Sequence, residues 1–220
     1  MHIVIADDHP VFRSGLIFLL NNSFENIKID QFDNGGDVAE FVALRQPDIC
    51  ILDIDMPVRS GLDVCQDIRE KNQQTKIIVL TFHQDIEMLK LAMYKGANAF
   101  LMKDNTSEEI VDCIATVLEG KSYIPKKFIE ENRLLEETHS IKGDIDLLKT
   151  LTKTEIKTLK LVSQKYTSKE ISNLLFVSEK TIENYRSRIC KKLNLDARNN
   201  SLVMWVMENK VLIDNIKDLI

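Results

Sequence analysis

The feature that most constrains the fold is an alternation, repeated five times within residues 1–120, of a short apolar run and a longer amphipathic stretch. The run at 77–80 is apolar at every position, which is typical of a strand buried on both faces of a parallel sheet. We therefore expect an α/β domain, a (βα)5 parallel sheet covered by helices. The expected strands are 2–6, 27–32, 49–52, 76–81 and 99–102, and the expected helices are 11–20, 36–45, 62–71, 85–94 and 107–118.

Polar side chains stand where these strands end. Asp7 and Asp8 follow the first strand, Asp53 follows the third, Thr81 ends the fourth and Lys103 follows the fifth. In open parallel sheets, ligands bind outside the carboxyl ends of the strands, so these groups are expected to converge. A cluster of carboxylate oxygens suits a hard ion such as Mg²⁺, and Lys103 with Thr81 suits a phosphoryl group. Each aspartate alone is explained equally well as a helix cap, but helix capping does not account for the whole set.

The second half of the chain has a different pattern. Residues 121–147 are highly charged with a thin apolar stripe, which indicates a linker with one helix. Only helical patterns follow, at 153–164, 168–175, 179–193 and 199–208, which predicts a small all-α domain of four helices over 148–210. Two of the starts carry capping boxes, Thr152 with Glu155 and Thr167 with Glu170. Residues 211–220 form a C-terminal extension to which we assign no role.

The charge is distributed unevenly. Residues 1–120 hold 10 basic and 20 acidic side chains, whereas residues 148–210 hold 13 basic and 6 acidic ones. A helix that ends at 164, a second helix over 168–175, a short turn over 176–178 and the basic helix 179–193 have the layout of a helix-turn-helix. The basic half is therefore expected to bind double-stranded DNA. A charged helix can also be merely solvated, but the net charge and the helix order favour DNA. The expected contacts are Lys180, Thr181, Asn184, Arg186, Arg188, Lys191 and Lys192.

Asp7-Asp8-His9-Pro10, Asp53-Ile54-Asp55-Met56-Pro57 and the segment ending in Lys103 resemble the receiver domain of bacterial two-component response regulators. The resemblance implies that Asp53 accepts a phosphoryl group from a sensor histidine kinase. It implies that Asp8 and Asp53, with the backbone carbonyl of Asp55, hold Mg²⁺, and that Asp7 acts through water. Thr81 and Lys103 would bind the phosphoryl group, and Phe100 would be the aromatic switch residue. Phe82 departs from the small residue usual after Thr81 and is expected to narrow access for water or small phosphodonors.

Residues 148–210 resemble the LuxR-type DNA-binding domain, through Leu151–Glu155, the Ser168-Lys169-Glu170-Ile171 segment and the run from Val177 to Arg186. The whole chain is therefore similar to regulators of the NarL/FixJ type. The resemblance implies a homodimer on an operator after phosphorylation, with Leu202, Trp205 and Val206 of the last helix at the contact. Packing within the core of the domain itself is the alternative for this apolar helix. Glu183, Tyr185 and Lys165 depart from the family pattern, the last standing where many members have a helix-ending glycine.

Two other classes of protein share part of this pattern. A Mg²⁺-dependent phosphatase-type enzyme would also use Asp53 as a nucleophile, but the α/β half has no room for a cap domain. A DNA-binding protein with a vestigial receiver is disfavoured because all five site residues are present. No apolar stretch approaches the length of a membrane span, and the four dispersed cysteines are typical of reduced thiols, so we expect a cytoplasmic protein without a membrane partner.

Overall fold

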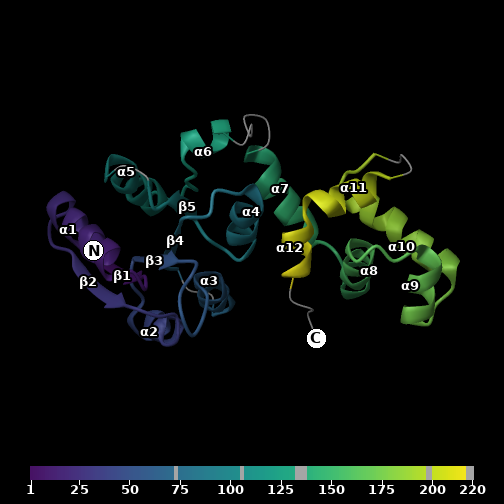
Figure 1. The fold of residues 1–220 in the computed structure, drawn as a ribbon, viewed down its shortest axis with the longest axis horizontal. Helices are drawn as coiled ribbons and strands as arrows, with labels where there is room; N and C mark the ends of the chain where they lie inside the picture. Colours follow the sequence, from purple (N-terminus) through teal and green to yellow (C-terminus); the bar gives the residue numbers. More distant parts are fainter. Residues whose placement is uncertain (72–73, 105–106, 132–137, 197–199, 217–220) are drawn as a thin grey trace. The chain divides into compact units, whose positions relative to one another are not determined.

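The computed structural model describes residues 1–71, 74–104, 107–131, 138–196 and 200–216, and its chain divides into two compact units, 1–135 and 136–220 (Figure 1). The first unit contains the sheet and the second is helical. This confirms the expected fold class. Among the described residues, no helix is long and apolar enough to span a bilayer.

The described strands form one parallel sheet in the order β2-β1-β3-β4-β5. Its strands are β1 (His2–Ala6), β2 (Lys28–Phe32), β3 (Ile49–Asp53), β4 (Lys76–Thr81) and β5 (Ala99–Met102). Strands β1, β3, β4 and β5 are almost entirely buried, whereas β2 is an edge strand with exposed positions. Apolar runs without alternation thus mark the strands covered on both faces.

Helices cover both faces of this sheet, with α1 and α5 on one side and α2 and α3 on the other (Figure 1). Their bounds are α1 (Pro10–Ser23), α2 (Val38–Arg45), α3 (Gly61–Glu70), α4 (Ile86–Tyr94) and α5 (Ser107–Leu118). Leu16 and Leu20 of α1 and Ile114 of α5 join the strands in one apolar core. Ser60 and Asp85 cap α3 and α4 by accepting backbone hydrogen bonds, which fixes where these helices begin.

One glycine allows the loop after Asp53 to fold back on the strand. Gly61 donates its backbone N–H to the carbonyl oxygen of Ile54 at 2.9 Å. A Cβ at position 61 would lie 1.9 Å from the carbonyl oxygen of Asp53, which is shorter than any tolerated contact. Glycine at position 61 therefore keeps the β3–α3 loop tight against the end of β3.

The segment expected to be a linker with one helix contains α6 (Lys126–Glu131) and most of α7 (Thr138–Lys149). Before α6, Tyr123 extends the sheet, because its N–H and C=O bond to the backbone of Asn98 and Phe100 beside β5. Helix α6 lies in the first unit and α7 in the second. The segment therefore contains two helices where one was expected, and each belongs to a different unit. The thin apolar stripe, interrupted by charges, did not indicate where one helix ends and the next begins. The expected linker residues 132–137 lie outside the described part of the chain.

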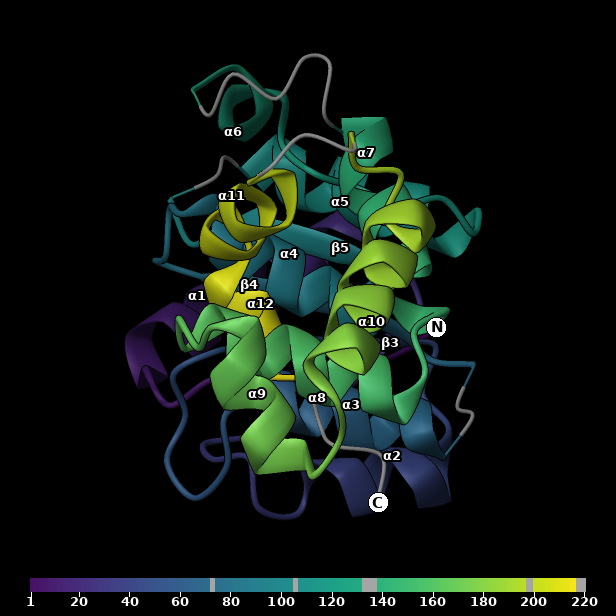
Figure 2. The same ribbon diagram turned by 90° about the vertical axis from the view of Figure 1, so that its right-hand side faces the viewer.

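The second unit continues after α7 with further helices (Figure 2). They are α8 (Lys153–Ser163), α9 (Ser168–Leu175), α10 (Glu179–Lys192), α11 (Ser201–Glu208) and α12 (Lys210–Asp214). Both expected capping boxes are confirmed, at the starts of α8 and α9. The expected helix 199–208 corresponds to α11, and its first residue, 199, lies outside the described residues.

The four helices expected over 148–210 are α8, α9, α10 and α11, and the segment that follows them, which was left without a role, forms α12. Helix α12 packs on α8 and buries Leu212 and Ile213, and Ile216 after it is also buried. The Ser163 hydroxyl donates to the Asp214 carboxylate at 3.2 Å, which ties the end of α8 to α12. The described part of the extension, 211–216, is therefore part of the core of this domain.

Candidate functional site

Asp7 and Asp53 are both buried at the carboxyl edge of the sheet, where β1 and β3 are neighbours. Asp53 is the last residue of β3 and only 2% exposed, and Asp7 follows β1 directly. Ala6 of β1 stands opposite Leu52 of β3, so register alone brings the two carboxylates side by side. Two buried carboxylates require a cation between or beside them.

Lys103 supplies that positive charge. Its Nζ atom lies 2.8 Å from Asp53 Oδ2 and 2.9 Å from Asp7 Oδ2, and its side chain is fully buried. The backbone N–H of Lys103 donates to the Thr81 carbonyl at 2.8 Å, which holds it beside the end of β4. The ammonium is thus fixed against the carboxylate that the sequence selects as acceptor.

Burial raises the pKa of the Asp53 carboxyl, and the nearby Asp7 carboxylate raises it further. Lys103 and the backbone N–H of Asp55 oppose this by stabilising the ionised form. Burial by itself favours the protonated acid, and the contact with Lys103 favours the carboxylate.

The expected metal ligands are only partly brought together. Oxygen atoms of Asp7, Asp8 and Asp53 and a ring nitrogen of His9 all lie within 4.8 Å of one another. His9 Nδ1 is 2.8 Å from Asp8 Oδ1 and 3.3 Å from Asp7 Oδ1. This set of oxygens on one side of Asp53 fits a divalent cation.

The Asp55 side chain, in contrast, lies outside this cluster. It is 66% exposed, and its Oδ2 atom is 2.9 Å from His83 Nε2. A role of Asp55 in holding metal is therefore limited to its backbone carbonyl, as the resemblance implies. Its carboxylate is solvated and paired with a histidine, unlike the buried carboxylate of Asp53.

Thr81 and Phe100 lie on one face of the sheet. In the register of β4 and β5, Val79 pairs with Phe100 and Thr81 pairs with Met102, while the alternate residues Leu80 and Leu101 belong to the core on the other face. Both side chains are completely buried, and the Thr81 hydroxyl accepts the N–H of His83 at 3.0 Å. Thr81 and Phe100 therefore lie on neighbouring strands and on the same face of the sheet.

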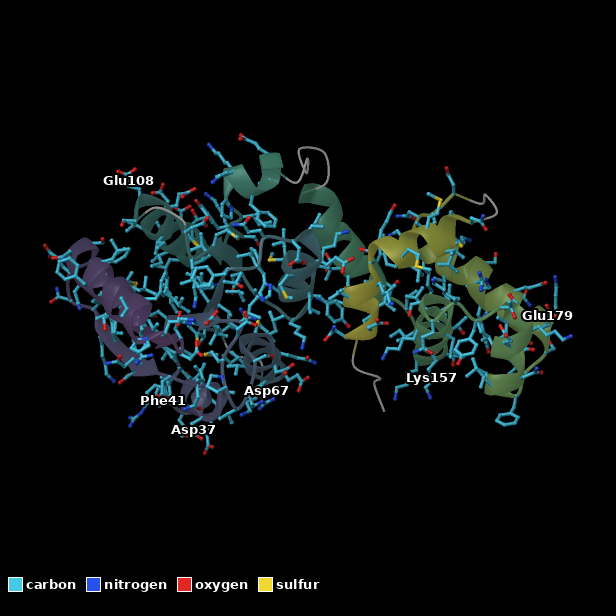
Figure 3. The ribbon with its side chains drawn as sticks, viewed as in Figure 1. Asp37, Phe41, Asp67, Glu108, Lys157 and Glu179 are labelled. Atoms are coloured by element: carbon cyan, nitrogen blue, oxygen red, sulfur yellow. The ribbon has the colours of Figure 1, made fainter. Side chains whose placement is uncertain are left out.

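The residues expected to contact DNA lie on α10, most of them on its exposed side. Ser178 caps this helix by accepting the N–H of Thr181 at 3.1 Å, and Glu179 at its first turn points into solvent (Figure 3). Lys180, Asn184, Arg188 and Lys191 are exposed, and Thr181 and Arg186 are half-buried. Lys180 Nζ lies 3.3 Å from Glu183 Oε2, so Glu183 is paired with a lysine of the same helix.

Lys192 differs from the other expected DNA contacts. Its Nζ atom donates to the nearly buried Glu155 carboxylate at 2.7 Å and to the Thr150 carbonyl at 3.1 Å. Glu155 is also the capping-box residue of α8. Lys192 therefore ties the end of α10 to the start of α8, and its charge is used within the domain.

The expected dimer residues Leu202, Trp205 and Val206 are buried in the second unit. They pack inward because α11 contacts α8, α10 and α12. The exposed apolar side chains of α11 are Met204 and Met207. A surface formed by α11 would therefore use these methionines, and the three expected residues instead hold the helix in the core.

Sequence reasoning missed two of the three side chains that enclose Lys103. Its Nζ atom lies 5.1 Å from the ring centres of both Phe12 and Phe82, and 3.4 Å from His9 Nδ1. His9 follows Asp7 and Asp8 directly, so its position in the chain was the available signal. Phe12 carried no signal, because one aromatic residue in an amphipathic helix is usually a core residue.

Comparison with known proteins agrees with both halves of this description. The family model described as a response regulator receiver domain matches residues 3–115, and that of the bacterial regulatory proteins of the luxR family matches residues 149–205. The oxygen regulatory protein NreC of Staphylococcus carnosus (strain TM300) is 34% identical over 216 residues, covering 96% of this chain and 99% of that protein. The transcriptional regulatory protein DegU of Brevibacillus brevis is 28% identical over 216 residues, covering 92% of each.

Solved structures give the same result for the first unit. The signal receiver domain of the putative response regulator NarL from Mycobacterium tuberculosis has a TM-score of 0.52 and 30% identity, covering 55% of this chain and 97% of that one. None of these similarities supports a phosphatase-type enzyme.

Proposed function

The chain belongs to the response regulators that join a receiver domain to a LuxR-type DNA-binding domain, and is a phosphorylation-dependent transcriptional regulator; on that premise we propose that Asp53 is its phosphoacceptor. The observation that carries this proposal is the contact of Lys103 Nζ with Asp53 Oδ2 at 2.8 Å in a buried setting. A sensor histidine kinase is the proposed donor.

In the proposed transfer, a carboxylate oxygen of Asp53 attacks the phosphorus of a kinase phosphohistidine. The phosphorus–nitrogen bond breaks, and the imidazole leaves with the electron pair and takes up a proton. Lys103 pairs with the added negative charge, and the Thr81 hydroxyl donates to a phosphoryl oxygen once it is released from the N–H of His83. Phe100, on the same face as Thr81, then changes its packing.

Magnesium is the proposed cofactor. Asp8 and Asp53 would hold it together with the backbone carbonyl of Asp55, and Asp7 would act through water. When bound, the ion would neutralise charge that develops on the phosphoryl oxygens. His9, within reach of the same oxygens, is the side chain that must move aside or join the ligands.

The acceptor is tested by incubating the chain with a phosphodonor and Mg²⁺. Incorporation of one phosphoryl group per chain is then measured by intact mass. Asp53→Asn keeps the size of the side chain and is expected to abolish labelling. Asp55→Asn is the matched control, and it is expected to label at the rate of the wild type. If Asp53→Asn were labelled and Asp55→Asn were not, the phosphoacceptor would be Asp55. Steady turnover of a small phosphoester would instead favour a phosphatase.

We propose that the exposed face of α10 binds a double-stranded DNA operator through Lys180, Thr181, Asn184, Arg186, Arg188 and Lys191. Lys192 is left out of this set because of its bond to Glu155. Since its proposed partner is DNA, we expect the protein to act in the cytoplasm. The salt dependence of binding tests the phosphate contacts.

Phosphorylation is proposed to produce a homodimer whose contact on α11 is formed by Met204 and Met207. These side chains are exposed and apolar, and methionine adapts readily to a partner surface. Met204→Glu is expected to prevent dimerisation of the phosphorylated chain in sedimentation analysis while the fold remains intact. A phosphorylated Met204→Glu chain that still dimerises would assign the contact to another surface.

A further inference from the structure

A phenylalanine that its own domain does not cover lies in the turn between α9 and α10. Phe176 is 95% exposed, the highest value among the large apolar side chains that the structure describes. Its φ of 54° is in the left-handed region, which glycine adopts without steric cost and phenylalanine does not. Exposing an aromatic ring and holding this backbone conformation both cost free energy, and a ring that is almost fully exposed recovers neither. The ring is therefore expected to make its contact with a partner.

The turn holds Phe176 beside the start of α10. The N–H of Val177 donates to the Ser172 carbonyl at 3.0 Å, which closes the end of α9. Ser178, two residues after Phe176, caps α10 by accepting the N–H of Thr181 at 3.1 Å. Figure 2 shows α9 and α10 joined at one end of the unit, where this turn lies. The ring is therefore attached to the N-terminal end of the helix that is proposed to contact DNA.

We propose that Phe176 contacts the C5-methyl group of a thymine in the major groove and so contributes to the choice of operator. This proposal rests on the proposed binding of DNA by α10. In a helix-turn-helix, the N-terminal residues of the second helix contact base edges, and the turn directly before them is continuous with that contact. A phenylalanine ring has no hydrogen-bonding group, and the thymine methyl is the apolar group that base pairs present in the major groove.

The surroundings of the ring favour DNA over a protein partner. The neighbouring apolar side chains, Leu174 and Val177, are exposed by only 50% and 36%. Ser178, Glu179 and Lys180 after the turn are exposed and polar. This apolar surface is too small for the core of a stable protein interface, whereas one ring among polar neighbours matches the single methyl group of one base pair. The ring would thus add base readout to a helix that its charges hold on the phosphates.

The experiment uses the phosphorylated full chain and a duplex that the wild type selects from a random library. This duplex is made once with thymine and once with uracil in place of every thymine, so that the two differ only in methyl groups. Phe176→Ala is expected to bind the thymine duplex about fourfold more weakly than the wild type, as for loss of one buried methyl group. It is expected to bind the uracil duplex as tightly as the wild type does. The salt slope should not change, because no charge is removed.

Two further variants separate this contact from effects on folding and on surface aromatics in general. Phe176→Gly removes the same ring and relieves the left-handed backbone, so it is expected to unfold at a higher temperature and still lose affinity for the thymine duplex. Tyr166→Ala removes an exposed aromatic side chain just before α9, at the opposite end of this helix. It is expected to bind both duplexes as the wild type does.

If Phe176→Ala loses the same factor of affinity on both duplexes, the ring does not contact a thymine methyl, and the inference is overturned while DNA binding by α10 stands. Unchanged binding of both duplexes would overturn it as well and leave the ring to a protein partner. If the wild type selects no duplex at all, the proposed binding of DNA by α10 fails, and the role of Phe176 with it.

Discussion

The rings of Phe100 and Phe128 meet edge to face, with centroids 5.5 Å apart and planes inclined by 63°. Phe100 belongs to β5 and Phe128 to the short helix α6, and both side chains are buried. Helix α6 is thus fastened to the aromatic residue that shares a sheet face with Thr81. A rearrangement of Phe100 after phosphorylation would reach the segment that leads out of the receiver by direct contact.

Phe128→Ala is expected to detach α6 from the receiver. Removing a buried phenylalanine costs about 3 kcal/mol of stability, more than a six-residue helix can recover by itself. The measurement is hydrogen exchange of the backbone amide at position 129, which donates to the Pro125 carbonyl and is expected to lose protection. Ile129→Ala, at a half-buried position of the same helix, is the control and should leave α6 docked. Unchanged exchange in Phe128→Ala would mean that other contacts hold the helix.

The fold of the receiver was predictable because the sequences of its central strands are apolar at almost every position. Fully apolar runs such as Ile77 to Leu80, alternating with amphipathic stretches, favour a parallel sheet covered on both sides, and in that arrangement Asp53 and Lys103 stand at the same edge. The limits of α6 and α7 were not predictable in this way. Their apolar residues are few, and which unit covers them depends on contacts distant in sequence.

The same limitation explains the side chains whose surroundings were misjudged. The apolar stripe of α11 reveals that Trp205 is covered, but not whether a second copy or the domain's own core covers it. Lys192 on a basic helix is expected to face solvent or DNA, and its partner Glu155 lies 37 residues earlier. Phe82 showed only that a bulky residue stands at the mouth, while its contact with Lys103 required the arrangement of three loops.

Lys165→Gly is expected to stabilise the second unit by about 0.5–1 kcal/mol. Lys165 follows α8 with a φ of 67°, a left-handed conformation that glycine adopts at no steric cost and that lysine does not. Its exposed side chain makes little contact that would be lost. Thermal unfolding of the full chain should show a higher transition for this unit. Lys165→Ala keeps the steric cost, so a gain of equal size in that variant would contradict the explanation.

The Glu155–Lys192 pair makes the stability of the second unit dependent on pH. Burial disfavours ionisation of Glu155, but hydrogen bonds from Lys192 and Thr152 outweigh it and hold the pKa of the carboxyl below its ordinary value of 4.5. Because the folded pKa is lowered, the contribution is complete above pH 4.5 and is lost as pH falls through the folded value.

Glu155→Gln is the variant that isolates this effect. At neutral pH it is expected to be less stable than the wild type by about 1–2 kcal/mol, since it weakens the bond to Lys192. The difference, measured by urea unfolding at several pH values, should shrink as the wild-type carboxylate is protonated. A difference that stays constant into acid would show that the ionised form of Glu155 makes no special contribution.

Lys191 and Lys192 are adjacent, yet substitutions at these positions are expected to affect DNA binding in different ways. Lys191 is exposed on α10, so Lys191→Ala should remove one phosphate contact and reduce the slope of log affinity against log salt by about 1. Lys192 already donates to Glu155 and Thr150, so Lys192→Ala should leave that slope unchanged and lower the stability of the domain. Fluorescence anisotropy with a labelled duplex at several salt concentrations, paired with urea unfolding, separates the two effects. If Lys192→Ala reduces the slope as much as Lys191→Ala does, the bond to Glu155 must break on DNA, and Lys192 returns to the set of phosphate contacts.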